Sequence, residues 1–311
     1  MDSVSKLSPD QYRTIVTRPN DFDAFWDDLL VQAAQIPLNA TMELVPLHCT
    51  LEVEVYDVHY DSLDGLRIAG WYCLPRERSG KLPAIAHMPG YLSEPPIPRE
   101  SARQGYAAFG AGPRGKLRSH QQFNPGYPGL LTHNIVDRNT YSYRGFYIDA
   151  VRVIDFLLSR DEVDSESIGV TGGSQGGGLT IAIAALRPEV RAAAAAAPFL
   201  SGFMDSIELL HTYPYQEIRD YLRLYPERKE AVQNTLAYFD GINFAPRVTC
   251  PINVFIGLQD NICPPQTGYA LFGALASEDK RIYPYKGHGH DAGRVHYRAI
   301  LDDFWKTHLN P

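Results

Sequence analysis

The order of short apolar segments and helical segments constrains the fold of this chain most strongly. From Pro83 onward the two kinds of segment alternate. The expected strands are 84–88, 106–110, 167–171, 192–197, 252–257 and 281–285, and the expected helices are 147–160, 177–186, 267–275 and 295–307. Strands separated by helices pair in parallel and are buried on both faces of their sheet. The alternation therefore predicts an α/β fold with a mostly parallel central sheet and helices on both faces.

One expected strand conflicts with local propensity. Residues 192–197 are all alanine, which by itself favours a helix. A short apolar run that ends at Pro198 nevertheless stands where the alternation requires a strand, so we expect a buried strand there.

Three regions depart from the alternation. Residues 1–45 contain an amphipathic helical pattern and are expected to form an N-terminal helical extension. Residues 51–60 and 66–74 flank a turn sequence, which predicts an antiparallel hairpin at a sheet edge. Residues 203–243 are rich in charged and aromatic side chains. We expect a helical insertion near the active site that shapes its pocket, or alternatively an ordinary pair of surface helices.

Composition excludes several classes of protein. The net charge of −7 argues against a dedicated nucleic-acid binder. Because no apolar stretch is long enough to span a bilayer and the N-terminus does not resemble a signal peptide, we expect no membrane association. The four cysteines are scattered, which predicts reduced thiols in a cytoplasmic protein rather than a zinc site or a disulfide scaffold.

The candidate nucleophile lies in the sequence Gly172-Gly173-Ser174-Gln175-Gly176-Gly177-Gly178. It contains the pattern G-x-S-x-G between an expected strand and an expected helix. A serine on such a turn has strained backbone, small neighbours and an exposed hydroxyl, and the N–H of the next residue, Gln175, can stabilise an oxyanion. The alternatives are a glycine-rich packing turn and a phosphate-binding loop, although no lysine follows the glycines as a P-loop requires.

A catalytic serine needs a base, and the base needs an acid that orients it. Asp260 directly follows the expected strand 252–257 and is our candidate acid, with an N-cap role as the alternative. Asp240 and Asp291 are weaker candidates because neither directly follows a clear strand.

Two histidines could be the base. His288 lies nearer to the end of the expected strand 281–285 than His290 does, so we expect His288. A metal site formed by His288, His290, Asp291 and His296 is the alternative, but no upstream residues have ligand spacing, so no metal is expected. Tyr91 follows an early strand, and its N–H is the candidate second oxyanion donor.

Several motifs together resemble the acetyl xylan esterase and cephalosporin C deacetylase family, carbohydrate esterase family 7. They are Gly-Gly-Ser174-Gln-Gly-Gly-Gly, Gly90-Tyr91, Tyr143-Arg144-Gly145, Asp149-Ala150-Val151-Arg152 and Asp260-x-Ile262-Cys263-Pro264-Pro265-x-Thr267. The resemblance implies a single α/β-hydrolase domain over 1–311, no cofactor, and removal of short acyl groups, chiefly acetyl. It also implies Ser174, Asp260 and His288 as the triad and the Tyr91 and Gln175 amides as oxyanion donors. Members form ring-like hexamers, so a homo-oligomer is implied.

Two positions depart from the pattern of that family. The family usually has Arg-Gly-Gln after an early strand, where this chain has Arg114-Gly115-Lys116. The histidine of the family is usually followed by Glu, whereas Gly289 follows His288.

The sequence thus predicts an enzyme that hydrolyses small carboxylic esters, such as those of acetylated sugars or cephalosporins. Phe199, Phe203 and Ile262 are expected to face the pocket, with core packing as the alternative for the two phenylalanines. A longer-chain esterase and a serine peptidase or amidase are alternatives on the same fold, although only about eighty residues precede the hydrolase part and many such peptidases carry an additional domain there. A non-catalytic binding protein is a third alternative.

Overall fold

The computed structural model describes residues 8–310. Residues 1–7, on which the signal-peptide expectation partly rests, lie outside the described residues. The chain forms a nine-stranded sheet of order β1-β2-β3-β5-β4-β6-β7-β8-β9. The strands are β1 (Thr41–Leu44), β2 (Val53–Asp61), β3 (Arg67–Pro75), β4 (Leu82–Met88), β5 (Ala107–Gly112), β6 (Val163–Gly173), β7 (Val190–Ala196), β8 (Ile252–Gly257) and β9 (Lys280–Tyr285).

The pairing of the strands confirms the predicted arrangement. Strands β5, β4, β6, β7, β8 and β9 pair in parallel. Strand β2 pairs antiparallel with both β1 and β3, and β3 joins β5 antiparallel. The predicted hairpin is therefore present, but β1 lies outside it and forms the edge. That strand comes from the segment 1–45, so this extension is not wholly helical.

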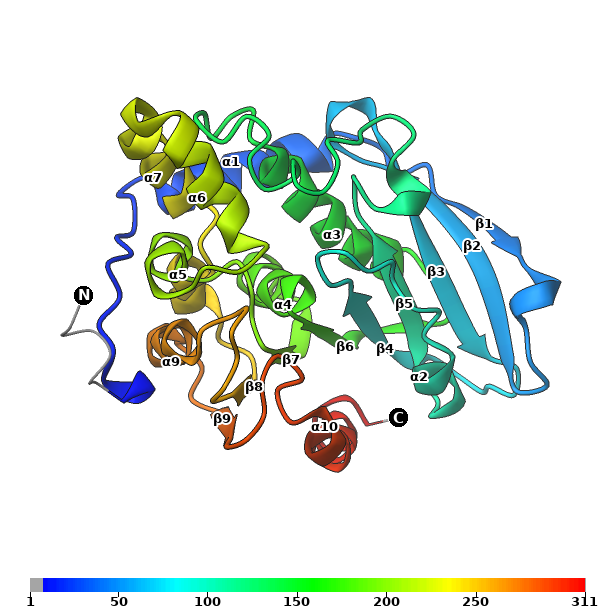
Figure 1. Cartoon of the computed structure of the whole chain (residues 1–311). Helices are drawn as coiled ribbons and strands as arrows, with labels where there is room; N and C mark the ends of the chain where they lie inside the picture. Colours follow the sequence, from blue (N-terminus) through cyan, green and yellow to red (C-terminus); the bar gives the residue numbers. More distant parts are fainter. Residues whose placement is uncertain (1–7, 311) are drawn as a thin grey trace.

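The helices lie on both faces of the sheet (Figure 1). They are α1 (Phe22–Ala34), α2 (Arg99–Arg103), α3 (Ser142–Leu158), α4 (Gln175–Leu186), α5 (Phe203–Leu209), α6 (Tyr215–Leu224), α7 (Lys229–Ala237), α8 (Gly241–Phe244), α9 (Pro265–Ala274) and α10 (Arg294–Leu309). None of the helices within residues 8–310 is both long and apolar enough to cross a membrane.

Successive side chains of the central strands belong alternately to two hydrophobic cores. In β4, Ala84 and Ala86 belong to the large core that also contains residues of α3 and α4. Ile85, between them, belongs to a smaller core with Trp305 and Leu309 of α10. Because successive side chains of a strand point to opposite faces, each central strand is buried on both sides.

The alanine-rich segment is strand β7, as the alternation predicts. Helix α4 begins with glycines and lies close to this strand. A Cβ atom added to Gly177 would come within 2.7 Å of the Ala196 carbonyl oxygen, and one added to Gly178 within 2.1 Å of the Phe199 carbonyl oxygen. Small side chains on both elements thus allow the close packing, and tertiary packing overrides the helix propensity of alanine.

The segment 203–243 is helical, as expected, and comprises α5, α6 and α7. It is tied to the N-terminal extension by polar contacts. The Tyr12 hydroxyl and the Thr14 hydroxyl donate to the buried Asp205 carboxylate at 2.6 and 2.7 Å. The Trp26 indole donates to the Tyr238 carbonyl at 2.8 Å. These contacts, of which that of Trp26 is fully buried, join the segment to the rest of the domain, and its role in shaping the pocket stays a prediction.

Candidate active site

Ser174 stands on a strained turn between β6 and α4. Its backbone has φ 57° and ψ −121°, in the region that non-glycine residues rarely adopt. Three backbone hydrogen bonds hold the turn. The Ser174 N–H donates to Ala196, while the N–H groups of Phe199 and Gly178 donate to the Ser174 carbonyl. The side chain is half-buried and remains accessible. Strain that the surroundings maintain in this way is typical of functional residues.

The two glycines of the G-x-S-x-G pattern are required by close backbone contacts. A Cβ atom on Gly172 would come within 2.6 Å of the Gly176 backbone, and a Cβ atom on Gly176 within 2.3 Å of the Met88 carbonyl oxygen. Real Cβ atoms do not approach backbone so closely, so larger residues would displace the turn. These two contacts are the physical reason why the G-x-S-x-G pattern, which predicts the nucleophile, has glycine at both positions.

Asp260 lies just beyond the end of β8 and is almost fully buried. Its Oδ1 accepts the N–H groups of Ile262 and Cys263 at 2.8 and 2.9 Å. Its Oδ2 is hydrogen-bonded to Nδ1 of His290 at 2.9 Å. The N-cap of α9 is Pro264, so the alternative role of Asp260 as the cap of that helix is not realised. The carboxylate is instead fixed in place and aimed at a histidine.

The weaker candidate Asp240 has a structural role. Its carboxylate caps α8 by accepting the Ile242 N–H and also accepts the N–H groups of Gly202 and Phe203. Burial raises the pKa of Asp240 to about 6.

His290, and not His288, contacts the candidate acid. The His288 side chain points elsewhere, with Nδ1 2.7 Å from the Asp291 carboxylate and Nε2 3.2 Å from Nε2 of His296. The geometry therefore favours His290 as the base and does not support the expected choice of His288.

The path of the loop explains this difference. The carbonyl oxygen of His288 accepts the Gln259 N–H at 2.9 Å. A Cβ atom on Gly257 would lie only 1.9 Å from the Gly289 carbonyl oxygen. The backbone of residues 288 and 289 thus crosses directly over the end of β8. This path brings the next side chain, that of His290, to Asp260.

One sequence signal could have identified His290. The family that the motifs resemble has an acidic residue after its histidine, and Asp291 follows His290 in this chain. The number of residues between the end of the strand and each histidine was a poorer guide to the base, because the loop must first cross β8.

A thiol lies beside the three candidate catalytic residues. The Cys263 thiol is adjacent to the Ser174 hydroxyl, and burial holds its pKa well above the usual range. Potential ligand atoms of Asp260, Cys263 and His290 lie within 4.8 Å of one another. Within residues 8–310, these three form the cluster that could hold a metal. However, Asp260 already uses both oxygens in hydrogen bonds, so we interpret the cluster as an acid–base pair beside a protonated thiol.

The two candidate oxyanion donors, Gln175 and Tyr91, stand at the start of α4 and after β4. Gln175 is the first residue of α4, so its N–H has no carbonyl partner within the helix. Its side-chain amide donates to the Tyr143 hydroxyl at 2.7 Å. Tyr91 follows β4 and is buried, and its hydroxyl donates to the buried Glu217 of α6 at 2.6 Å.

The expected pocket residues differ in exposure. Phe199 and Phe203 are fully buried. Phe199 packs against the rings of Tyr91 and Tyr215 at centroid distances of 5.8 and 4.4 Å. Their burial favours the core-packing alternative for the two phenylalanines. Ile262 is half-buried beside Asp260 and stays a candidate for the pocket.

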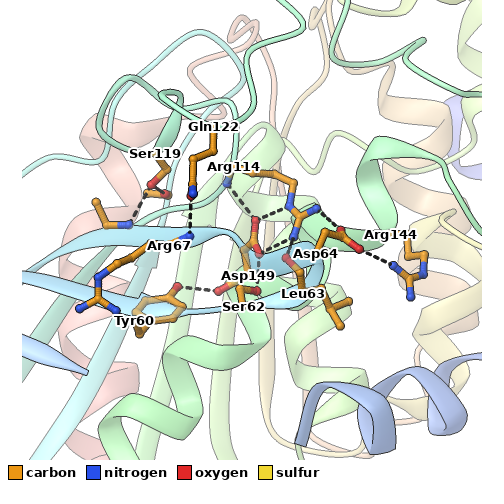
Figure 2. A network of polar contacts seen from close by, with 12 residues as sticks. Tyr60, Ser62, Leu63, Asp64, Arg67, Arg114, Ser119, Gln122, Arg144 and Asp149 are labelled. Carbon is orange, nitrogen blue, oxygen red and sulfur yellow. Dashed lines mark hydrogen bonds and ion pairs between the residues drawn. The ribbon is translucent and has the colours of Figure 1, made fainter. Parts of the chain in front are cut away.

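Arg114, two residues before Lys116, is the centre of a buried ionic network (Figure 2). Its Nε and Nη2 donate to the two oxygens of Asp149 at 2.7 and 3.0 Å, and its backbone N–H also donates to Asp149. Arg114 is 4% exposed and Asp149 is 0% exposed. Its Nη1 also donates to the more exposed Asp64 at 2.6 Å. The network fixes the loop after β5 onto helix α3.

Comparison with known proteins identifies relatives of this chain. The acetyl xylan esterase (AXE1) family matches residues 4–308. The acetyl esterase Axe7A of Xylanibacter ruminicola is 30% identical over 298 residues, which are 91% of this chain and 66% of Axe7A. This chain therefore spans just under two thirds of that relative.

Two solved structures resemble this one over nearly the whole chain. The acetyl xylan esterase from Paenibacillus sp. R4 has a TM-score of 0.88 and 36% identity, covering 99% of this chain and 100% of its own. Acetyl xylan esterase 1 from Thermoanaerobacterium sp. JW/SL YS485 has a TM-score of 0.87 and 28% identity, covering 97% and 98%. The family and these relatives together indicate a serine carboxylesterase that acts on acetyl esters. The chain belongs to the acetyl xylan esterase family and has the α/β-hydrolase fold.

Proposed function

We propose that this chain removes short acyl groups, chiefly acetyl, from small esters such as acetylated sugars or cephalosporins. Ser174 is the nucleophile, His290 the base and Asp260 the acid that orients the base. The observation that carries this assignment is the 2.9 Å hydrogen bond between the buried Asp260 and His290, at the same edge of the sheet as the strained Ser174.

Acylation uses the free nitrogen of the histidine. Because Nδ1 of His290 donates to Asp260, Nε2 carries the lone pair that accepts the Ser174 proton. The Ser174 oxygen attacks the acyl carbon, and the N–H groups of Tyr91 and Gln175 stabilise the resulting oxyanion. Asp260 stabilises the protonated imidazole. His290 then gives the proton to the leaving alcohol, and an acyl-serine remains.

Deacylation repeats these steps with water. His290 takes a proton from the water while the water oxygen attacks the acyl-serine, and the same N–H groups hold the second oxyanion. Collapse of this intermediate releases the carboxylic acid and returns the proton to Ser174.

The acyl-chain preference tests the proposed substrate class. We expect kcat/KM for 4-nitrophenyl esters to fall steeply from acetyl and propionyl to octanoyl. The reason is that the rings of Tyr91, Phe199 and Tyr215 pack against one another beside the proposed oxyanion donor and fill the space that a long acyl chain would need. Rates are measured for the series from acetyl to octanoyl, with S174A as the blank.

Two results would contradict this substrate class. A maximum at longer acyl chains that still depends on Ser174 would indicate a longer-chain esterase. Faster cleavage of peptide or anilide substrates than of acetyl esters would indicate a peptidase or amidase.

Three further properties belong to the same proposal. We expect a homo-oligomer, up to a hexamer, which light scattering on the purified protein can measure. We expect a cytoplasmic location, which the four free thiols support. We also expect the segment 203–243 to shape the alcohol side of the pocket, since its Glu217 contacts Tyr91 beside the reaction centre.

A further inference from the structure

Lys116 is a buried cation close to the proposed reaction centre. It is 2% exposed. Within residues 8–310, its Nζ donates hydrogen bonds to two acceptors, the carbonyl oxygens of Gly90 and Tyr91, the latter at 2.5 Å. Burying an ammonium group carries a large desolvation cost, and neither bond is to a carboxylate.

The two carbonyls belong to the peptide groups on either side of the Tyr91 α-carbon. The Gly90 carbonyl and the Tyr91 N–H are parts of one planar peptide group. A cation bound at the carbonyl oxygen therefore fixes the plane of the N–H that faces the oxyanion. It also withdraws electron density from that N–H, because polarised hydrogen-bonded groups strengthen one another in a low dielectric.

The loop that carries Lys116 is itself held firmly. Arg114 is bound to Asp149 in the buried network described above (Figure 2). Gly115 has φ +79°, which a residue with a side chain adopts only with strain. This conformation turns the chain so that Arg114 reaches α3 while Lys116 reaches the Gly90–Tyr91 peptide.

We propose that the Lys116 ammonium is a positioning residue that orients and polarises the Gly90–Tyr91 peptide and adds positive charge near the developing oxyanion. This inference rests on the oxyanion role proposed above for the Tyr91 N–H. Lys116 is the position at which this chain departs from the glutamine of its family. A neutral amide can donate hydrogen bonds to these carbonyls but supplies no charge.

The charge of Lys116 depends on pH in an accessible range. Burial lowers the pKa of Lys116 to about 7, partly opposed by the nearby carboxylate of Glu94. The other groups that face it are the Tyr127 ring, 5.6 Å from Nζ, and Tyr91, whose hydroxyl is bound by Glu217. Lys116 is charged below this pKa and neutral above it. The stabilisation of the oxyanion should therefore weaken as the pH rises through about 7.

The test compares two variants of Lys116 with a lysine control. K116Q keeps hydrogen-bond donors without charge, and K116M removes both. K81M removes an exposed lysine just before β4 and is the control. We measure kcat and KM for 4-nitrophenyl acetate between pH 5.5 and 9, thermal unfolding, and the inhibition constant of a trifluoromethyl ketone, which forms a tetrahedral adduct with serine.

We expect kcat to fall about tenfold in K116Q and about 10²-fold in K116M, with KM within about twofold, since loss of one oxyanion donor costs about 10²–10³-fold. In the wild type, kcat/KM should decline as the pH rises through about 7, and this decline should disappear in both variants. The inhibition constant of the ketone should rise in proportion to the loss of kcat/KM. K81M should match the wild type in every measurement.

Three results would overturn the proposal. The first is a folded K116M with the kcat of the wild type. The second is a K116Q whose kcat/KM still declines above about pH 7 as in the wild type. The third is a variant that loses kcat while the inhibition constant of the ketone stays unchanged. If K116M does not fold, K116Q alone decides the question. If the wild type hydrolyses esters through Ser174 while both variants behave like it, this inference fails and the proposed function stands. If the wild type hydrolyses no ester, the proposed function fails.

Discussion

Replacing His290 with alanine should lower kcat for 4-nitrophenyl acetate by about 10⁴- to 10⁶-fold, the range for loss of a triad histidine or its correct orientation. KM should change little, because His290 acts on the proton of Ser174 rather than on the bound ester. The reason is the 2.9 Å contact with Asp260, which leaves Nε2 as the only basic nitrogen of the ring. Steady-state hydrolysis of the purified variant measures the effect.

His288 provides the matched control, since it lies two residues away on the same loop. Its side chain is 25% exposed and pairs with Asp291, whose side chain is 51% exposed. An exposed pair contributes at most about 1 kcal/mol to stability. Because the His288 ring is bonded to Asp291 and His296 rather than to Asp260, H288A should keep kcat within about fivefold of the wild type. Near-complete inactivation of H288A together with an active H290A would assign the base to His288. Equal losses in both variants would mean that the conformation of the loop, rather than His290, limits the reaction.

The second large effect concerns stability. D149A should lower the free energy of unfolding by about 3–5 kcal/mol, because it leaves the Arg114 guanidinium buried without its main partner. Arg114 is 4% exposed and donates both Nε and Nη2 to Asp149. Urea denaturation followed by tryptophan fluorescence measures the loss.

Asp64 offers a control that contacts the same guanidinium. Its side chain is 52% exposed, so D64A should cost at most about 1 kcal/mol. A loss in D149A no larger than that in D64A would contradict the central role of the buried pair. The double variant R114L/D149L should be more stable than D149A, because it removes both buried charges together.

Local features of the sequence predicted much of the fold and the nucleophile. The alternation of segments predicted every strand from β4 to β9. It also predicted the strand at residues 192–197, although alanine by itself favours a helix. The turn around Ser174 was recognisable because the whole G-x-S-x-G pattern lies within five consecutive residues, although Gly176 is also required by its contact with the distant Met88. Gly172 and Gly176 approach each other directly.

Features that depend on distant contacts could not be predicted in the same way. The position of His290 follows from a loop that crosses β8 over Gly257, and His290 meets Asp260 across 30 positions of the sequence. The contact between Tyr91 and Glu217 joins residues 126 positions apart, and Arg114 meets Asp149 across 35 positions. The edge strand β1 also depends on its pairing with β2, since residues 41–44 have no clear strand pattern of their own.

Covalent labelling tests the central assignment most directly. Diethyl 4-nitrophenyl phosphate transfers a diethylphosphoryl group preferentially to a serine that a base activates, with release of 4-nitrophenolate. Mass spectrometry of the labelled protein should show one adduct, on the peptide that contains Ser174, formed in proportion to the loss of esterase activity. H288A should be labelled at the wild-type rate, and H290A should be labelled far more slowly. An adduct at another residue, or equally fast labelling of H290A, would contradict the assignment of Ser174 and His290.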